Sequence, residues 1–167
     1  MANPPHPATA LTAIGVALLL TGCGPTPRLS QEKIAKIRQG NPGITEACLN
    51  KLKFGGETAF PDRVDQCFKM EPAKRWRGLW RASFELSLFC PDLQSKCDDT
   101  SSGEKIWLTN QSKADFRHTD RNGSLYQLDF IGRKTAQRGF HGHLSSFDHE
   151  IVVDRLIGIK QIEPGLQ

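Results

Sequence analysis

The first constraint on this chain is an apolar run near its start, from Ala10 to Leu20. Gly24-Pro25-Thr26-Pro27 would end any helix soon after it, and no Asp, Glu, Lys or Arg precedes Arg28. A membrane-spanning helix needs about 20 apolar residues, more than this run offers. The run could form a buried helix, but its position and its small flanking residues are typical of a secretory signal peptide. We therefore expect cleavage of residues 1–22, which leaves one domain of about 145 residues.

The run closes on the four residues Leu20-Thr21-Gly22-Cys23. This segment resembles the lipobox of bacterial lipoproteins, in which the cysteine thiol receives a diacylglycerol and becomes the first mature residue. The resemblance implies a lipidated Cys23, a membrane partner held through that anchor, and a lipidated tether over residues 23–29. Gly24 is not the aspartate that enterobacteria use for inner-membrane retention. The resemblance therefore favours the outer membrane, on its periplasmic face, over the inner membrane.

The five cysteines of the chain are an odd number, which leaves one free thiol in an oxidising compartment. If Cys23 carries the lipid, then Cys48, Cys67, Cys90 and Cys97 remain and can pair completely. Four cysteines allow three connectivities. We favour Cys48–Cys67 and Cys90–Cys97 because each pair is local and lies within its own structural unit. The alternative is four buried thiols in a reduced protein.

Helical patterns occupy the segment 30–72. Caps and apolar spacing predict a helix from Ser30 to Gly40 and a second one from Thr45 to Phe54. Apolar residues at i, i+3 and i+4 predict a third helix from Pro61 to Met70. The predicted Cys48–Cys67 bridge would join the second of these helices to the third.

Beyond Pro72 the apolar period changes to two, which indicates strands over 73–167. Alternation from Trp80 to Leu88 predicts one long half-buried strand. Asn122-Gly123 is a hairpin signal. Further strands are expected at 104–109, 114–118, 124–131 and 150–162, the last with Val153, Ile157 and Ile159 on one face and a bulge or bend at Gly158.

The fold class predicted from these patterns is α+β. Short N-terminal helices should pack on a small antiparallel, OB-like β-barrel or a strongly bent sheet, because strands in hairpin order make antiparallel sheet. We expect residues 30–167 to form one globular unit.

Several segments of the β region follow one another in an order found in other proteins. They are Trp76-Arg77-Gly78-Leu79-Trp80, 84–91, Trp107-Leu108, 139–144 and 149–153. This order resembles a group of small bacterial envelope proteins with a Phe-Glu-x-Ser-x-Phe strand, a tryptophan strand and a Gly-His-Leu-Gly turn. The resemblance implies a small β-barrel-like domain outside the cytoplasm and no particular activity. Ser145 stands where the second glycine of that turn is expected.

Three histidines, His141, His143 and His149, lie close together in the sequence, near Asp148 and Glu150. A His-x-His pair in an extended chain places both imidazoles on one face, where they could bind zinc or copper. The alternative is that these are ordinary loop histidines, since glycines interrupt the segment.

Arg75, Trp76, Arg77 and Arg81 mix cations with an aromatic ring and could contact lipid headgroups or nucleic-acid bases. The alternative is that the tryptophans belong to the core and the arginines solvate the strand. The net charge of +4 is modest, and both this charge and the expected compartment disfavour nucleic acid.

The sequence contains no G-x-S-x-G, H-E-x-x-H or P-loop motif, and Glu85 shares the polar face of its predicted strand. We therefore expect a non-enzymatic, lipid-anchored envelope protein with a binding or structural role, with no cofactor and with an envelope protein as a candidate partner. The alternatives are a periplasmic metal-binding lipoprotein that uses the histidine loop and, with less support, a hydrolase that uses Glu85 or His141. The sequence does not fix the oligomeric state.

Overall fold

A computed structural model describes residues 26–92, 96–109, 116 and 122–165. The apolar run and Cys23 lie outside the described residues, as does the predicted strand 114–118 apart from Phe116. Within the described part of the chain, no helix is long and apolar enough to cross a membrane.

Two α-helices begin where their caps predict. In α1 (Gln31–Gly40) the Ser30 side chain accepts a hydrogen bond from the backbone of Lys33 at 3.2 Å. In α2 (Glu46–Gly55) the Thr45 side chain accepts one from the backbone of Cys48 at 3.3 Å. Each cap satisfies a backbone N–H that has no partner within its helix, so the first two predicted helices are confirmed.

The prediction of a third helix over 61–70 is wrong. This segment contains only a single 3-10 turn, η2 (Val64–Gln66), preceded by another, η1 (Glu57–Ala59). Its backbone pairs with the segment between α1 and α2, because Thr45 donates to the Cys67 carbonyl at 2.8 Å and Lys69 donates to the Gly43 carbonyl at 2.9 Å. One 3-10 turn still brings residues three apart to the same side. The apolar spacing was therefore real, but pairing with a distant segment decided the conformation.

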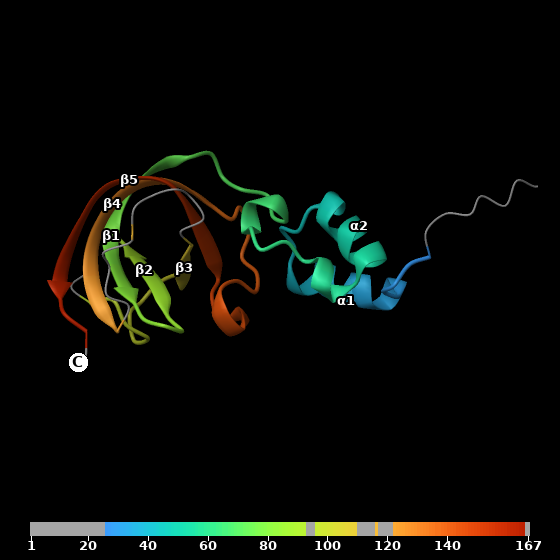
Figure 1. Cartoon of the computed structure of the whole chain (residues 1–167), viewed down its shortest axis with the longest axis horizontal. Coiled ribbons are helices and arrows are strands. Elements are labelled where there is room, and N and C mark those ends of the chain that lie inside the picture. Colours follow the sequence, from blue (N-terminus) through green and yellow to red (C-terminus); the bar gives the residue numbers. More distant parts are fainter. Residues whose placement is uncertain (1–25, 93–95, 110–115, 117–121, 166–167) are drawn as a thin grey trace, which may run out of the picture.

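Five strands form a closed barrel in the order β1-β2-β3-β5-β4, with β4 pairing back to β1 (Figure 1). The strands are β1 (Lys74–Ala82), β2 (Ser87–Pro91), β3 (Ile106–Thr109), β4 (Ser124–Lys134) and β5 (His149–Glu163). All pairs are antiparallel except β3 and β5, which run parallel. The expectation of a wholly antiparallel sheet is corrected here, while a mixed α+β fold with a small barrel is confirmed.

The predicted strand 80–88 is two strands, β1 and β2, joined by a turn. The backbone of Ser83 donates to the Leu86 carbonyl at 2.7 Å, and the Ser83 hydroxyl accepts from the Leu86 backbone at 3.0 Å. Phe84 therefore stands at the tip of a hairpin and is 93% exposed. Glu85 shares this exposed tip, so it is solvated because of the turn and not because of the strand alternation from which its exposure was expected.

Strand β5 contains the irregularity predicted at Gly158. Asp129 of β4 pairs with Gly158, but its neighbour Phe130 pairs with Leu156, so one residue of β5 is extra at this point. A bulge of this kind reverses which residues face inward. A second shift lies between Val153 and Ile157, since Ile131 pairs with Arg155 but Gly132 pairs with Val153. Val153 is fully buried while Ile157 is exposed, which corrects the prediction that these two share a face. Ile159, opposite Leu128, stays on the same side as Val153.

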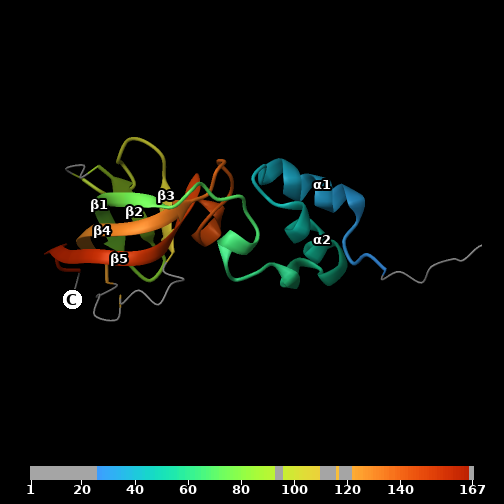
Figure 2. The ribbon, with the colours of Figure 1, turned by 90° about the horizontal axis from the view of Figure 1, so that it is seen from above.

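The helical layer and the barrel are in direct contact. Figures 1 and 2 show α1 and α2 beyond one end of the barrel, with residues 56–72 crossing between them. Val152 of β5 belongs to the apolar cluster of the helical layer, whereas its neighbours Ile151 and Val153 belong to the barrel core. The first half of β5 is therefore covered on both faces.

The two cysteine pairs lie where the local pairing predicted. Cys48 and Cys67 have Cα atoms 5.0 Å apart, and Cys90 and Cys97 have Cα atoms 5.7 Å apart, both within the usual range for disulfides. The first bridge ties α2 to η2, and the second ties the loop after β2 to the barrel wall.

Candidate functional site

A cleft of about 640 Å³ lies on the outer face of β3 and β5, between the barrel and the helical layer. One part of its wall comes from residues 60–68 of the helical side, and another part comes from residues 140–145 of the segment that joins β4 to β5. The lining residues are Asn41, Phe60, Pro61, Asp62, Val64, Phe68, Trp107, Thr109, Phe140, His141, Gly142, His143, Ser145 and Glu150. The cleft thus unites four segments that are far apart in the sequence.

Aromatic rings form much of the lining. Phe60 is 44% exposed and Phe140 is 60% exposed, whereas Phe68 is buried. Trp107 is half-buried and packs edge-on against Phe147, with ring centroids 5.0 Å apart. Two large exposed phenylalanines in the lining of one cleft are apolar surface that a ligand could cover.

Glu150 places a carboxylate in this aromatic setting. Its side chain is only 8% exposed, the Thr109 hydroxyl donates a hydrogen bond to it, and so does the backbone N–H of Gly142. Burial raises the pKa of Glu150 above its ordinary value, although both hydrogen bonds act in the opposite direction. Thr109 and Glu150 meet because β3 runs parallel to β5, with Trp107 opposite Glu150.

His141 is the second buried polar group of the lining, with a side chain 3% exposed. Its ring packs edge-on against Phe68 at a centroid distance of 4.8 Å, and its Nε2 atom has no hydrogen-bond partner among the described residues. Burial lowers the pKa of His141 to about 4, with a further lowering from His149 and an opposing hydrogen bond to the Gln137 backbone. The imidazole is therefore neutral at physiological pH.

The three histidines predicted as metal ligands are not gathered into one set. His143 is exposed, whereas His149 is buried, with Nδ1 3.2 Å from the Thr135 hydroxyl and Nε2 3.4 Å from a Glu104 carboxylate oxygen. Among the described residues, no group of three or more His, Cys, Asp or Glu side chains is arranged to hold a metal ion. The Asp148 carboxylate accepts a hydrogen bond from the Lys105 backbone at 3.0 Å and forms an ion pair with Arg138 at 2.7 Å. Of the three histidines, His141 and His143 line the cleft, whereas His149 does not.

We expect His141→Gln to flatten the pH dependence of stability. An unfolded histidine has a pKa of about 6.5, whereas that of folded His141 is about 4. Between these values the unfolded chain binds more protons, so stability falls as the pH falls. As the pH falls from about 7 to about 5, His141 should lower the free energy of unfolding of wild type by about 2 kcal/mol, and the His141→Gln variant should not show this decrease. Urea unfolding at both pH values measures the difference, with exposed His143→Gln as the control; equal slopes in wild type and His141→Gln would contradict the prediction.

The predicted basic surface residues are mostly engaged within the protein. Arg75 and Arg77 both pair with Asp129, at 2.6 Å and 3.1 Å, and the hydrogen bonds from Arg75 lower the pKa of Asp129 to about 2. Trp76 is half-buried, donates from Nε1 to the Gly132 carbonyl at 3.1 Å and packs against Phe89. This tryptophan contributes to the core, as the alternative interpretation held.

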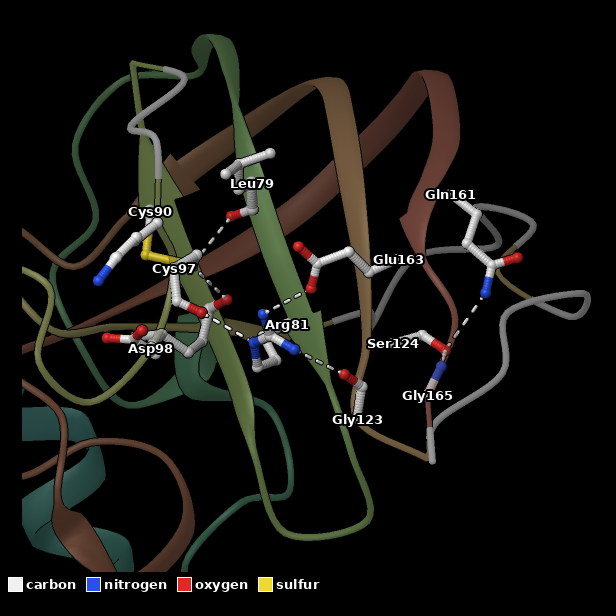
Figure 3. Close-up of polar contacts among 12 residues, drawn as sticks. Leu79, Arg81, Cys90, Cys97, Asp98, Gly123, Ser124, Gln161, Glu163 and Gly165 are labelled. Atoms are coloured by element: carbon white, nitrogen blue, oxygen red, sulfur yellow. Dashed lines mark hydrogen bonds and ion pairs between the residues drawn. A yellow bond between two sulfur atoms is a disulfide. The ribbon is translucent and has the colours of Figure 1, made fainter. Parts of the chain in front are cut away.

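Arg81 ties three separate parts of the barrel together (Figure 3). Its guanidinium donates to the Cys97 carbonyl at 2.9 Å, to the Gly123 carbonyl at 2.9 Å, and to Glu163 near the end of β5 at 3.3 Å. Ser124, next in the chain, accepts hydrogen bonds from Gly165 and Gln161 on the same side. Arg81 therefore fixes the disulfide loop, the start of β4 and the C-terminal strand, rather than forming a free cationic contact.

Comparison with known proteins gave no match: no family model, no curated protein and no solved structure matches this chain.

Proposed function

We propose that this protein is a lipid-anchored, non-catalytic binding protein of the bacterial envelope, and that the cleft beside β3 and β5 is its binding site. The cleft carries the proposal, since its volume falls in the range of about 300–1,000 Å³ typical of ligand sites. Its lining combines aromatic walls with a few buried polar groups, as such sites usually do. The Glu150 carboxylate already accepts hydrogen bonds from Thr109 and Gly142, which suits a group that holds a ligand in place.

The barrel is proposed to be of the OB kind. A five-stranded Greek-key barrel defines that group, and here five strands close in the order β1-β2-β3-β5-β4 with a parallel β3–β5 pair. OB folds bind along β2 and β3 and through the loops that follow β1 and β4. In this chain the segment between β4 and β5 supplies one wall of the cleft, and β3 supplies Trp107 and Thr109.

The anchor is proposed to hold the helical layer close to the membrane. The Arg28 and Leu29 backbones donate to the Lys53 carbonyl at 2.8 Å and 3.1 Å, so the fold begins at the end of the tether. From Cys23 to Leu29 an extended chain spans about 20 Å. A lipid on Cys23 would therefore keep the cleft within a short distance of the lipid surface.

The anchor is tested by intact mass of the full chain produced with its own leader and extracted in detergent. We expect a protein that begins at Cys23 and carries acyl chains, and a Cys23→Ala control that is neither processed nor lipidated. A water-soluble product that still begins at Met1 would contradict the anchor.

The binding role is tested on the same anchored protein. Small molecules extracted from wild type are compared by mass spectrometry with those from a Phe60→Ala/Phe140→Ala variant, which removes both exposed rings of the cleft. We expect molecules that accompany wild type and are depleted from the variant. Identical extracts from the two proteins would contradict the assignment of the cleft.

A further inference from the structure

The charge of the cleft is opposite to that of the whole chain. The sequence carries a net charge of +4, yet the described residues that line the cleft include the buried Glu150 and neither lysine nor arginine. The arginines next to these walls are committed elsewhere, since Arg63 pairs with Asp65 at 2.7 Å and Arg138 pairs with Asp148 at 2.7 Å. The field inside the cleft therefore favours positive ligands.

Glu150 has acceptor capacity left for such a ligand. A carboxylate offers about four lone-pair sites, and the described contacts of Glu150 are one hydroxyl and one backbone N–H, from Thr109 and Gly142. Both donors are neutral, so no described cation compensates this buried group. A buried carboxylate without a cationic partner is costly, and a ligand cation would supply the missing charge.

The other buried polar side chain of the described lining, His141, does not oppose a cation. His141 is held neutral by burial, so it adds no positive charge at physiological pH. Its Nε2 atom is buried without a hydrogen-bond partner among the described residues, which is unusual for an imidazole in a protein interior. The neutral imidazole therefore adds no repulsion toward a cation and leaves Glu150 as the acidic group buried in the described lining.

The aromatic walls suit the same ligand. Phe60 and Phe140 are exposed, and both line the cleft together with Trp107 of β3. A cation over the face of an aromatic ring is attracted by its quadrupole, most strongly where water is excluded. The apolar part of a ligand would cover these rings while its charged end reaches Glu150.

From this arrangement we propose that the cleft binds a small organic cation, with an ammonium group directed at Glu150 and an apolar body between the aromatic walls. The inference rests on the proposed function, because it takes the cleft to be the binding site. It excludes anionic ligands of the same shape.

Three probes with one aromatic body and different charges test the proposal. Phenethylamine is cationic, 2-phenylethanol is neutral and phenylacetate is anionic at neutral pH. Calorimetric titration of the oxidised, detergent-solubilised protein should show the cation binding about tenfold or more tightly than the alcohol, and the carboxylate least tightly of the three. Equal affinity for the amine and the alcohol would overturn the proposal.

Glu150→Gln removes the charge but preserves the shape of the side chain. We expect it to weaken phenethylamine binding about tenfold and to leave 2-phenylethanol binding unchanged. The matched control is Glu85→Gln, an exposed carboxylate on the β1–β2 turn, which should change neither affinity. Should Glu150→Gln fail to fold, the comparison of the three probes on wild type decides the proposal, since it needs no variant.

The outcomes separate this inference from the proposed function. If all probes bind regardless of charge and binding disappears in Phe60→Ala/Phe140→Ala, the cleft is a binding site but not one for cations. If amine binding survives Glu150→Gln undiminished, the inference is likewise overturned. If no probe binds wild type, the inference fails, while the comparison of extracted molecules still decides the binding role.

Discussion

Phe130→Ala should lower the free energy of unfolding by about 4 kcal/mol, because it opens a cavity at the centre of the barrel. The Phe130 side chain is fully buried, and its ring meets that of Phe89 edge-on at a centroid distance of 5.2 Å. Both rings belong to the cluster that fills the barrel, so a smaller side chain leaves space that a closed sheet cannot collapse to fill. Urea unfolding of the oxidised protein, followed by circular dichroism, measures the loss.

The matched control is Phe84→Ala, which deletes the same ring from the tip of the β1–β2 turn. Phe84 is 93% exposed, so its loss should change the free energy of unfolding by less than about 0.5 kcal/mol. A large effect at Phe84, or a small one at Phe130, would contradict the position assigned to β1, β2 and β4 in the barrel.

Phe84 also shows why the sequence alone misassigned the face of β2. In an antiparallel pair, residues directly opposite one another share a face, and here Ala82 is opposite Ser87. The four-residue turn therefore places even-numbered positions of β1 and odd-numbered positions of β2 inside the barrel. Alternation extended through this turn assigned Leu88 to the interior and Ser87 to solvent, whereas Ser87 is buried and accepts a hydrogen bond from the Trp80 indole at 2.9 Å.

Features set by local chemistry were predictable from the sequence. The caps at Ser30 and Thr45 satisfy backbone groups three residues away, and Gly158 lies beside an irregularity of its own strand. The third predicted helix failed because its backbone bonds go to residues 43–45, a partner that no periodicity reveals.

The candidate site, too, was predictable from the sequence only in part. The sequence singled out His141 and His143, and both line the cleft, but it offered them as metal ligands or as ordinary loop histidines. Their setting depends on Glu150 meeting Thr109, 41 positions earlier, through the parallel pairing of β3 and β5. Hairpin order predicts antiparallel neighbours, so nothing in the sequence pattern pointed to this contact. Exposed Phe60 and Phe140 gave no signal either, since single phenylalanines in loops fit many environments.

Removing the Cys48–Cys67 bridge should cost about 3 kcal/mol of stability. The bridge closes a loop of 19 positions and restricts the unfolded chain accordingly. It also holds the segment around η2, which has only one 3-10 turn of its own. A Cys48→Ala/Cys67→Ala variant avoids stray thiols, and urea unfolding in oxidising buffer measures its stability.

The loss of stability should be concentrated in the segment that the bridge holds, and this segment forms part of the cleft wall. Val64 and Phe68 form part of the cleft wall on this segment, so amide hydrogen exchange over 57–70 should quicken in the Cys48→Ala/Cys67→Ala variant. The matched control, Cys90→Ala/Cys97→Ala, removes a bridge of only 7 positions, so it should cost less and leave exchange over 57–70 unchanged. A contrary result would be that reductant leaves the free energy of unfolding of wild type unaltered and that Cys48→Ala/Cys67→Ala has this same free energy. The four cysteines would then be buried thiols. The proposal of an oxidising compartment would then lose its main support in the fold. That proposal accounts for five cysteines by a lipid on Cys23 and two bridges between the other four.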